Sequence, residues 1–299
     1  MSKLVVITGT NASGKSGLGV ELAKEFGGEI ISADSRQVFT GLDLGSGKIT
    51  KEEMQGIPHY MIDVARPNDF FSLKEYQKGA YDAIDDILAR GKTPFLVGGT
   101  GLYVNSVVDG YNLTDAKPDL ELRGKIEAMS REEIIKELEK TNPEALKTVD
   151  ILNKRRLERA LEKSLAGYMN DNASNPRYEV LEIGVTWPRE VLYERIRVRL
   201  DKRLKEGMIE EVKGLREQGA TDDFLYKLGL EYRYILMYLR GEFPDFDSFY
   251  NKLFMEIRHL AKEQMTWFRK RKNIQWIDMQ TNPKEEATKK ILEFLKVVE

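Results

Sequence analysis

Residues 9–16 form a phosphate-binding loop by sequence. They read Gly-Thr-Asn-Ala-Ser-Gly-Lys-Ser, a complete G-x-x-x-x-G-K-[ST] pattern between an apolar run and a segment with helical spacing. In such a loop the backbone N–H groups surround an anion, Lys15 supplies a positive charge for the outer phosphate, and Ser16 supplies a hydroxyl for magnesium (Mg²⁺). We expect a polyphosphate to be bound here, by Gly9, Thr10, Asn11, Ala12, Ser13, Gly14, Lys15 and Ser16.

Two polar residues follow other predicted strands. Asp34 comes directly after the apolar run 29–33, and Thr100 stands in the sequence Gly-Gly-Thr-Gly at 98–101. In an open α/β sheet, ligands bind beyond the carboxyl ends of the strands, so both residues are expected near the phosphate loop. Asp34 can accept a proton from a nucleophile or hold Mg²⁺ through water, and Thr100 can donate to phosphate oxygens. The alternatives are an ordinary turn aspartate and a plain strand-to-helix turn.

Two groups of basic residues are candidates for anion binding. Arg195 and Arg199 lie four positions apart on a predicted helix and share a face, where they can stabilise a leaving diphosphate. The alternative is a solvated face paired with neighbouring glutamates. Arg258, Lys262 and Arg269 share a face of a later helix, which makes a local basic patch compatible with RNA.

The order of predicted elements indicates an α/β fold. Apolar, β-branched runs alternate with helical segments at both ends of the chain, which predicts a parallel sheet wrapped by helices. Only helical patterns occur in the middle, so we expect a core at 1–115 and 178–299 and a helical insert domain at 116–177. Strands are predicted at 3–8, 29–33, 59–64, 93–97, 178–186 and 273–277, and helices outside the insert at 16–26, 72–89, 188–206, 247–272 and 283–299.

Composition limits the kind of protein. The chain has 299 residues, no cysteine and a net charge of −2, which excludes disulfides, thiolate zinc sites and a globally basic surface. No run approaches the length of about 18 apolar residues that a membrane span requires, and the first strand begins too early for a signal peptide. We expect a cytoplasmic protein with no membrane partner.

Several segments together resemble one family, the tRNA dimethylallyltransferases (tRNA isopentenyltransferases), in their bacterial type. Besides the phosphate loop, the similar segments include Asp-Ser-x-Gln-Val at 34–38, Val-Gly-Gly-Thr-Gly-Leu-Tyr at 97–103 and Arg-x-x-Arg-Ala-Leu-Glu at 156–162. Further matches lie at 41–48, 58–63, 195–199 and 261–268, so the resemblance spans nearly the whole chain in the right order. Thr10-Asn11, Phe39 and Glu263 depart from the family's usual residues.

The resemblance implies a P-loop NTPase-like fold and a prenyl transfer. Such enzymes move the dimethylallyl group of dimethylallyl diphosphate to N6 of the adenosine on the 3′ side of the anticodon, releasing diphosphate with the help of Mg²⁺. By correspondence, Asp34 is the base, Arg199 lies at the reaction centre, and Thr100 acts in catalysis. The partners implied are the tRNA anticodon stem-loop and dimethylallyl diphosphate, bound by a monomer. The residues implied in tRNA binding are Asp34, Ser35, Arg36, Gln37, Thr100, Arg123, Arg155, Arg156, Leu157, Glu158 and Arg159.

Two other functions remain open from the residues alone. One is a P-loop kinase acting on a nucleotide or small metabolite, which should carry an arginine-rich lid over ATP that the sequence does not display. The other is an RNA-binding paralogue without catalysis. That alternative predicts damage at Asp34 or Lys15, and both residues are intact.

Overall fold

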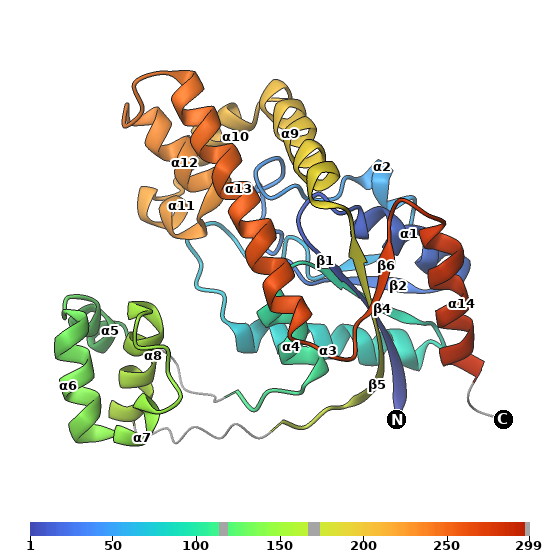
Figure 1. Cartoon of the computed structure of the whole chain (residues 1–299), viewed down its shortest axis with the longest axis horizontal. Helices are drawn as coiled ribbons and strands as arrows, with labels where there is room; N and C mark the ends of the chain where they lie inside the picture. The colour runs from blue at the N-terminus through green and yellow to red at the C-terminus, as the bar shows by residue number, and fades with distance from the viewer. Residues whose placement is uncertain (114–118, 167–173, 297–299) are drawn as a thin grey trace. The chain divides into compact units, whose positions relative to one another are not determined.

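A six-stranded parallel sheet forms the centre of the larger of two units (Figure 1). The computed structural model describes residues 1–113, 119–166 and 174–296. The strand order is β3-β2-β4-β1-β5-β6, and all neighbouring strands are parallel. The α/β prediction is therefore confirmed. The strands are β1 (Ser2–Gly9), β2 (Glu29–Ser32), β3 (His59–Tyr60), β4 (Pro94–Gly98), β5 (Tyr178–Thr186) and β6 (Gln275–Asp278).

Helices cover both faces of the sheet, which explains why β1 reads as a continuous apolar run. Val5 and Ile7 point to the face packed by α1 and α14, whereas Leu4 and Val6 point to the face packed by α3, α4 and α13 (Figure 1). The helices of this unit are α1 (Lys15–Glu25), α2 (Lys51–Met54), α3 (Leu73–Ala89), α4 (Gly101–Val108), α9 (Arg189–Lys205), α10 (Met208–Glu217), α11 (Asp222–Leu228), α12 (Leu230–Leu239), α13 (Phe246–Arg269) and α14 (Pro283–Lys296). No helix in the described ranges is long and apolar enough to cross a membrane.

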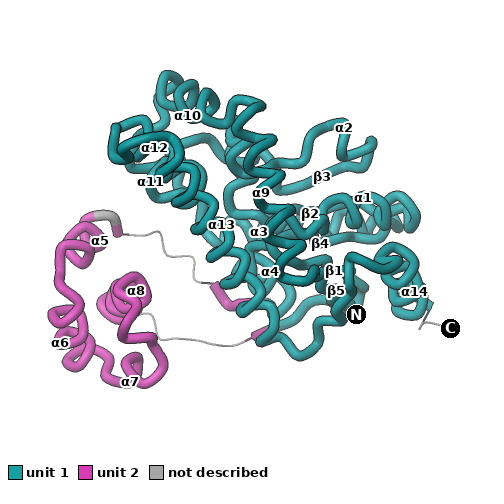
Figure 2. Tube along the Cα trace, turned by 45° about the horizontal axis from the view of Figure 1, so that its top comes forward, with its two compact units in different colours: residues 1–110, 175–299 teal, residues 111–174 magenta. Residues whose placement is uncertain are grey.

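The second unit comprises residues 111–174 and is helical (Figure 2). Its helices α5 (Leu120–Glu127), α6 (Arg131–Thr141), α7 (Pro143–Leu146) and α8 (Lys154–Leu165) enclose a separate core that includes Ile134, Leu138 and Leu161. The predicted boundary at 115–116 falls among residues 114–118, outside the described residues, and most of the predicted polar loop 168–177 does too.

The chain enters and leaves the second unit at one place. Asn175 N–H donates to the carbonyl of Gly110 at 3.0 Å, and Tyr111 pairs with Ser174 in an antiparallel bridge. Gly110 has φ 63°, and a Cβ there would lie 2.0 Å from the carbonyl oxygen of Asn175. Glycine is therefore required at this neck, on both conformational and steric grounds.

Three sequence predictions about elements are corrected. The strand predicted at 59–64 ends at Tyr60, because Met61 (φ 62°) and Asp63 (φ 55°) adopt left-handed backbone conformations that break the extended chain. Pro188 is the N-cap of α9 rather than its first helical residue. The region 208–239, which had no predicted element, contains α10, α11 and α12.

The parallel strands bring their carboxyl ends to one edge of the sheet. The phosphate loop follows β1, Asp34 follows β2, and Thr100 follows β4. Arg199 lies on α9, the helix that follows β5. This edge holds a cavity of about 910 Å³.

Candidate active site

The phosphate loop connects β1 to α1 and has the backbone geometry of an anion cradle. Gly14 has φ 89° and serves as the N-cap of α1, and Ala12 has φ 57°. A Cβ at Gly9 would lie 2.7 Å from a methyl of Val185, so the glycine lets β5 approach closely. Glycine is thus needed at Gly14 for its positive φ and at Gly9 for the close approach of β5. The positive end of the α1 dipole faces the loop.

Side chains outside the loop hold its outer backbone groups. Arg195 Nε donates to the carbonyl of Ala12 at 2.9 Å, and Trp187 Nε1 donates to the carbonyl of Ser13 at 2.8 Å. The guanidinium of Arg195 stacks on the Trp187 ring at 4.4 Å. These bonds hold two carbonyls of the loop in place. Among the loop's N–H groups, that of Ser13 is bonded to the carbonyl of Thr10 and that of Asn11 to a glutamine side chain. Arg195, expected to stabilise diphosphate directly, supports the loop backbone.

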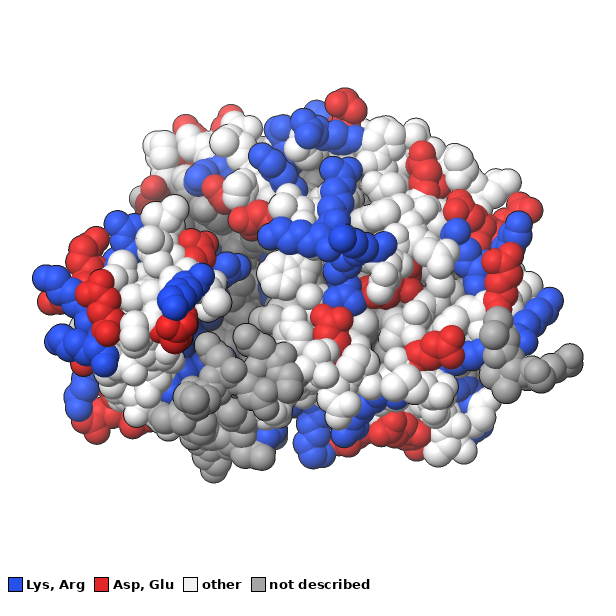
Figure 3. Space-filling model, turned by 60° about the horizontal axis from the view of Figure 1, so that its bottom comes forward, with Lys and Arg blue, Asp and Glu red and all other residues white. Residues whose placement is uncertain are grey.

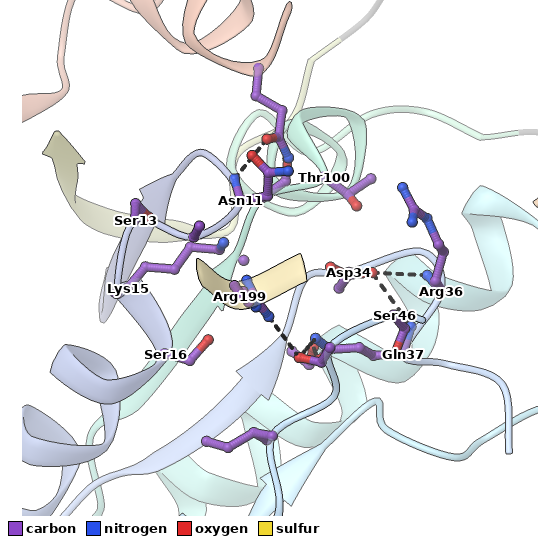
Figure 4. A pocket seen from close by; sticks show the side chains of 18 of the residues that line it. Asn11, Ser13, Lys15, Ser16, Asp34, Arg36, Gln37, Ser46, Thr100 and Arg199 are labelled. Atoms are coloured by element: carbon purple, nitrogen blue, oxygen red, sulfur yellow. Dashed lines mark hydrogen bonds between the residues drawn. The ribbon is translucent and has the colours of Figure 1, made fainter. Parts of the chain in front are cut away.

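Gln264 on α13 joins the phosphate loop to the loop after β4. Its Oε1 accepts from the backbone N–H of Asn11 at 2.8 Å, and its Nε2 donates to the carbonyl of Gly99 at 2.9 Å (Figure 4). The side chain of Asn11, which departs from the family pattern, donates to the carbonyl of Ile257 at 3.5 Å. Sequence reasoning assigned no role to Gln264 or Trp187, because each acts on residues far away along the chain.

Two half-buried cations, Lys15 and Arg199, line the cavity without an ion-paired carboxylate among the described residues. Lys15 Nζ donates to the carbonyl of Thr10 at 3.1 Å, and Arg199 Nη2 donates to the carbonyl of Gly47 at 3.2 Å. In the described part of the chain, no ion pair joins either residue to a carboxylate. Burial, assisted by the charge of Arg199, lowers the pKa of Lys15 to about 8. Burial and the charge of Arg203 lower the pKa of Arg199 to about 10. An anion bound between Lys15 and Arg199 would stabilise their charged forms and so raise both pKa values again.

Asp34 and Thr100 are brought together by the turn after β2. Asp34 Oδ1 accepts from the backbone N–H of Arg36 at 2.9 Å, and the Thr100 hydroxyl accepts from the backbone N–H of Ser35 at 3.0 Å (Figure 4). Asp34 therefore does have the role of a turn aspartate. Only its Oδ1 is used in these bonds, and the residue lines the cavity together with Lys15 and Arg199.

A carboxylate on α10 holds the loop that carries Gly47. Glu211 accepts from three consecutive backbone N–H groups, those of Asp43 at 3.0 Å, Leu44 at 2.5 Å and Gly45 at 3.0 Å. A Cβ at Gly47 would lie 1.5 Å from Arg203 Nη2. The loop thus offers its backbone directly to the arginines of α9.

The predicted site residues fall into two groups. The cavity of the first unit is lined by Asn11, Ala12, Ser13, Gly14, Lys15, Ser16, Asp34, Ser35, Arg36, Gln37, Thr100 and Arg199. Gly9 and Thr10 lie behind this lining, in the same loop. Glu231 and Arg203 also line the cavity. Arg203 continues the predicted arginine stripe of Arg195 and Arg199 four positions further along α9, whereas no sequence pattern marks Glu231.

The remaining predicted residues belong to the second unit. Arg123 pairs with Glu162 at 2.8 Å, and Arg159 also pairs with Glu162. Arg155 and Arg156 are exposed, whereas the side chain of Leu157 is fully buried in the unit's core. Glu158 forms an ion pair with Lys154 at 3.4 Å.

The chain is similar to known proteins over nearly its whole length. The family model described as IPP transferase matches residues 37–271. A tRNA dimethylallyltransferase of Thermoanaerobacter sp. is 41% identical over 98% of this chain and 97% of its own length, and tRNA dimethylallyltransferase 2 of Citrifermentans bemidjiense is 42% identical over 95% and 93%. The crystal structure of the full-length tRNA isopentenylpyrophosphate transferase from Bacillus halodurans is similar, with a TM-score of 0.75, 36% identity and 99% coverage of each chain. The chain therefore belongs to the IPP transferase family, that of the tRNA dimethylallyltransferases.

Proposed function

We propose that this protein transfers the dimethylallyl group of dimethylallyl diphosphate to N6 of the adenosine on the 3′ side of the tRNA anticodon, releasing diphosphate. The observation that carries the proposal is that one cavity holds two half-buried cations without an ion-paired carboxylate in the described part of the chain, Lys15 and Arg199, together with the carboxylate of Asp34. The cations suit a leaving diphosphate and the carboxylate suits an amine that must lose a proton.

The reaction is a substitution at the first carbon of the dimethylallyl group. The N6 nitrogen forms a bond to that carbon while the carbon–oxygen bond to diphosphate breaks, and the electron pair leaves with the oxygen. Lys15 and Arg199 stabilise the charge that develops on diphosphate. Asp34 takes the proton that N6 loses, using the oxygen that its turn does not occupy. The adenine must leave its stack to reach this position.

We assign Mg²⁺ to the phosphate loop. The described residues contain no group of three or more His, Cys, Asp or Glu side chains suited to a metal. Ser16 is exposed and lines the cavity, so its hydroxyl suits an ion held chiefly by diphosphate oxygens (Figure 4). When bound, the ion would neutralise part of the diphosphate charge.

We infer that the protein binds tRNA through contacts between its basic side chains and the tRNA phosphates. Exposed Arg155 and Arg156 on the second unit and Lys262 on α13 are available for such contacts. On the face drawn in Figure 3, one group of lysine and arginine side chains lies together, and elsewhere basic and acidic side chains are interspersed. In a chain with a net charge of −2, such local clusters must supply the attraction. We propose that the protein acts as a monomer in the cytoplasm.

The test is mass spectrometry of tRNA incubated with the protein, dimethylallyl diphosphate and Mg²⁺. We expect N6-dimethylallyladenosine beside the anticodon, and its loss in the Lys15→Ala variant. A parallel incubation with ATP and a panel of nucleotides tests the kinase alternative. Phosphorylated nucleotide without prenylated tRNA would replace our proposal by that alternative.

A further inference from the structure

A buried carboxylate on α12 faces the arginines of the cavity. The side chain of Glu231 is 7% exposed, and its Oε2 lies 2.5 Å from Arg36 Nη1 while its Oε1 lies 3.9 Å from Arg203 Nη1. The mechanism above gives this carboxylate no role. Its position is set by an unusual turn, because Gly229 (φ 75°) and Leu230 (φ 39°) both adopt left-handed conformations immediately before it. Such a conformation in a leucine persists only where its surroundings enforce it.

Glu231 divides the cavity's cations into two kinds. Arg36 and Arg203 have it as an ion-pair partner, whereas Lys15 and Arg199 bond only to backbone carbonyls in the described part of the chain. Burial by itself would lower the pKa of Arg36, but the charges of Glu231 and Asp34 outweigh that effect and raise it. Arg36 is thus a charged group with a fixed ion-pair partner. Lys15 and Arg199 feel the charge of Asp34, and Arg199 also that of Glu231, but neither forms an ion pair with a carboxylate in the described part of the chain.

The two kinds of cation lie on different sides of the cavity, and each side is the one that we assign to one of the two substrates. Arg36 belongs to the turn of Asp34, and Ser35 in that turn bonds Thr100, so this side of the cavity is where the acceptor base must arrive. Lys15 and Arg199 belong to the diphosphate side. We propose that Glu231 is a positioning residue that holds the guanidinium of Arg36 on the acceptor side and keeps it from binding the diphosphate. This inference rests on the proposed prenyl transfer for the meaning of the two sides.

Loss of this carboxylate should have two opposite effects. In Glu231→Gln, the freed guanidinium of Arg36 adds to the cations that face diphosphate, so diphosphate binds more tightly. The acceptor side loses its fixed arginine, so the reaction with tRNA slows. If Glu231 only stabilised the fold, its loss would not tighten diphosphate binding while it slows the reaction with tRNA, because partial unfolding weakens the binding of every ligand alike.

Titration calorimetry with inorganic diphosphate and Mg²⁺ tests the first effect without any need for catalysis. We expect Glu231→Gln to bind diphosphate about tenfold more tightly than the wild type, a coupling of ordinary size between two sites. The double variant Arg36→Gln/Glu231→Gln should return close to the wild-type affinity, because it removes one charge of each sign. Glu217→Gln, which removes an exposed carboxylate on α10, is the control and should change nothing. Unchanged or weaker binding by Glu231→Gln overturns the proposal.

Steady-state kinetics with tRNA test the second effect. We expect Glu231→Gln to lower kcat/KM for tRNA by about tenfold, with partial rescue in Glu231→Asp and no further loss when it is added to Arg36→Gln. Additive losses in the double variant would show that Glu231 does not act through Arg36. The double variant also guards against misfolding, since removing both partners of a buried pair leaves no uncompensated charge. If the wild type prenylates no tRNA, the proposed function fails, while the diphosphate titration still decides the role of Glu231.

Discussion

Diphosphate binding should depend on pH through Lys15. A lysine with its ordinary pKa of 10.5 is charged at every pH at which the enzyme would be assayed, but burial and the charge of Arg199 lower the pKa of Lys15 to about 8. The direction of the shift fixes the sign of the effect. The ammonium is present below pH 8 and is lost as the pH rises through 8, so affinity for diphosphate should fall on the alkaline side.

The size of the effect follows from the pKa. With a value of about 8, roughly nine-tenths of Lys15 is charged at pH 7 and roughly one-tenth at pH 9. If only the charged form binds, the affinity for inorganic diphosphate falls about tenfold between these two pH values. Binding near pH 8 should also draw a proton from the buffer, because the bound anion raises the pKa of the lysine again.

The assay is titration calorimetry in buffers of different ionisation enthalpy, which gives both affinity and proton uptake. Lys15→Arg is the matched control, since a guanidinium stays charged throughout and diphosphate's own ionisation affects both proteins equally. We expect the ratio of wild-type to Lys15→Arg affinity to fall about tenfold from pH 7 to pH 9. A constant ratio, with equal proton uptake, would refute the argument that burial has lowered this pKa.

Three further predictions follow from the site and the second unit. Asp34→Asn should lower single-turnover rates by roughly 10²–10⁴-fold with little change in tRNA binding, and a variant with near-normal turnover would remove Asp34 from the mechanism. Gly47→Ala should weaken diphosphate binding in calorimetry, because its Cβ would lie 1.5 Å from Arg203 Nη2 and 2.2 Å from Arg199 Nη2 and would displace both guanidinium groups. Gly27→Ala, with a similar φ of 60° and nothing within 4 Å, should retain binding. Arg156→Ala should reduce the slope of the logarithm of the tRNA binding constant against the logarithm of salt concentration by about one unit. Filter binding measures this slope, and an unchanged slope would exclude a phosphate contact at Arg156.

Elements with a local chemical signal were predictable from the sequence. The phosphate loop lies between β1 and α1 as expected, and β5 has the predicted bounds. Capping boxes begin helices at Ser72 and Ser130, and their sequence signal is local, because an N-cap hydroxyl and a glutamate three positions later satisfy each other's backbone groups.

Features that depend on distant partners were not predictable. The left-handed backbone at Met61 and Asp63 ends β3 early, and methionine in particular does not favour that conformation. Arg36 and Glu231 are separated by 195 positions, and no local pattern marks either as half of a pair. Gln264 likewise bridges two loops that only the sheet brings together.

The neck at Gly110 and Asn175 makes the second unit a module in the evolutionary sense. Because its two ends lie side by side, at the Gly110–Asn175 hydrogen bond and the Tyr111–Ser174 bridge, the core needs no particular length of chain between them, and insertions there should leave the sheet and the cavity untouched. Selection can therefore enlarge, shorten or exchange the insert while conserving the chemistry of the core. The cavity of the core and the surface of the second unit that we propose binds tRNA can thus diversify at different rates within one gene.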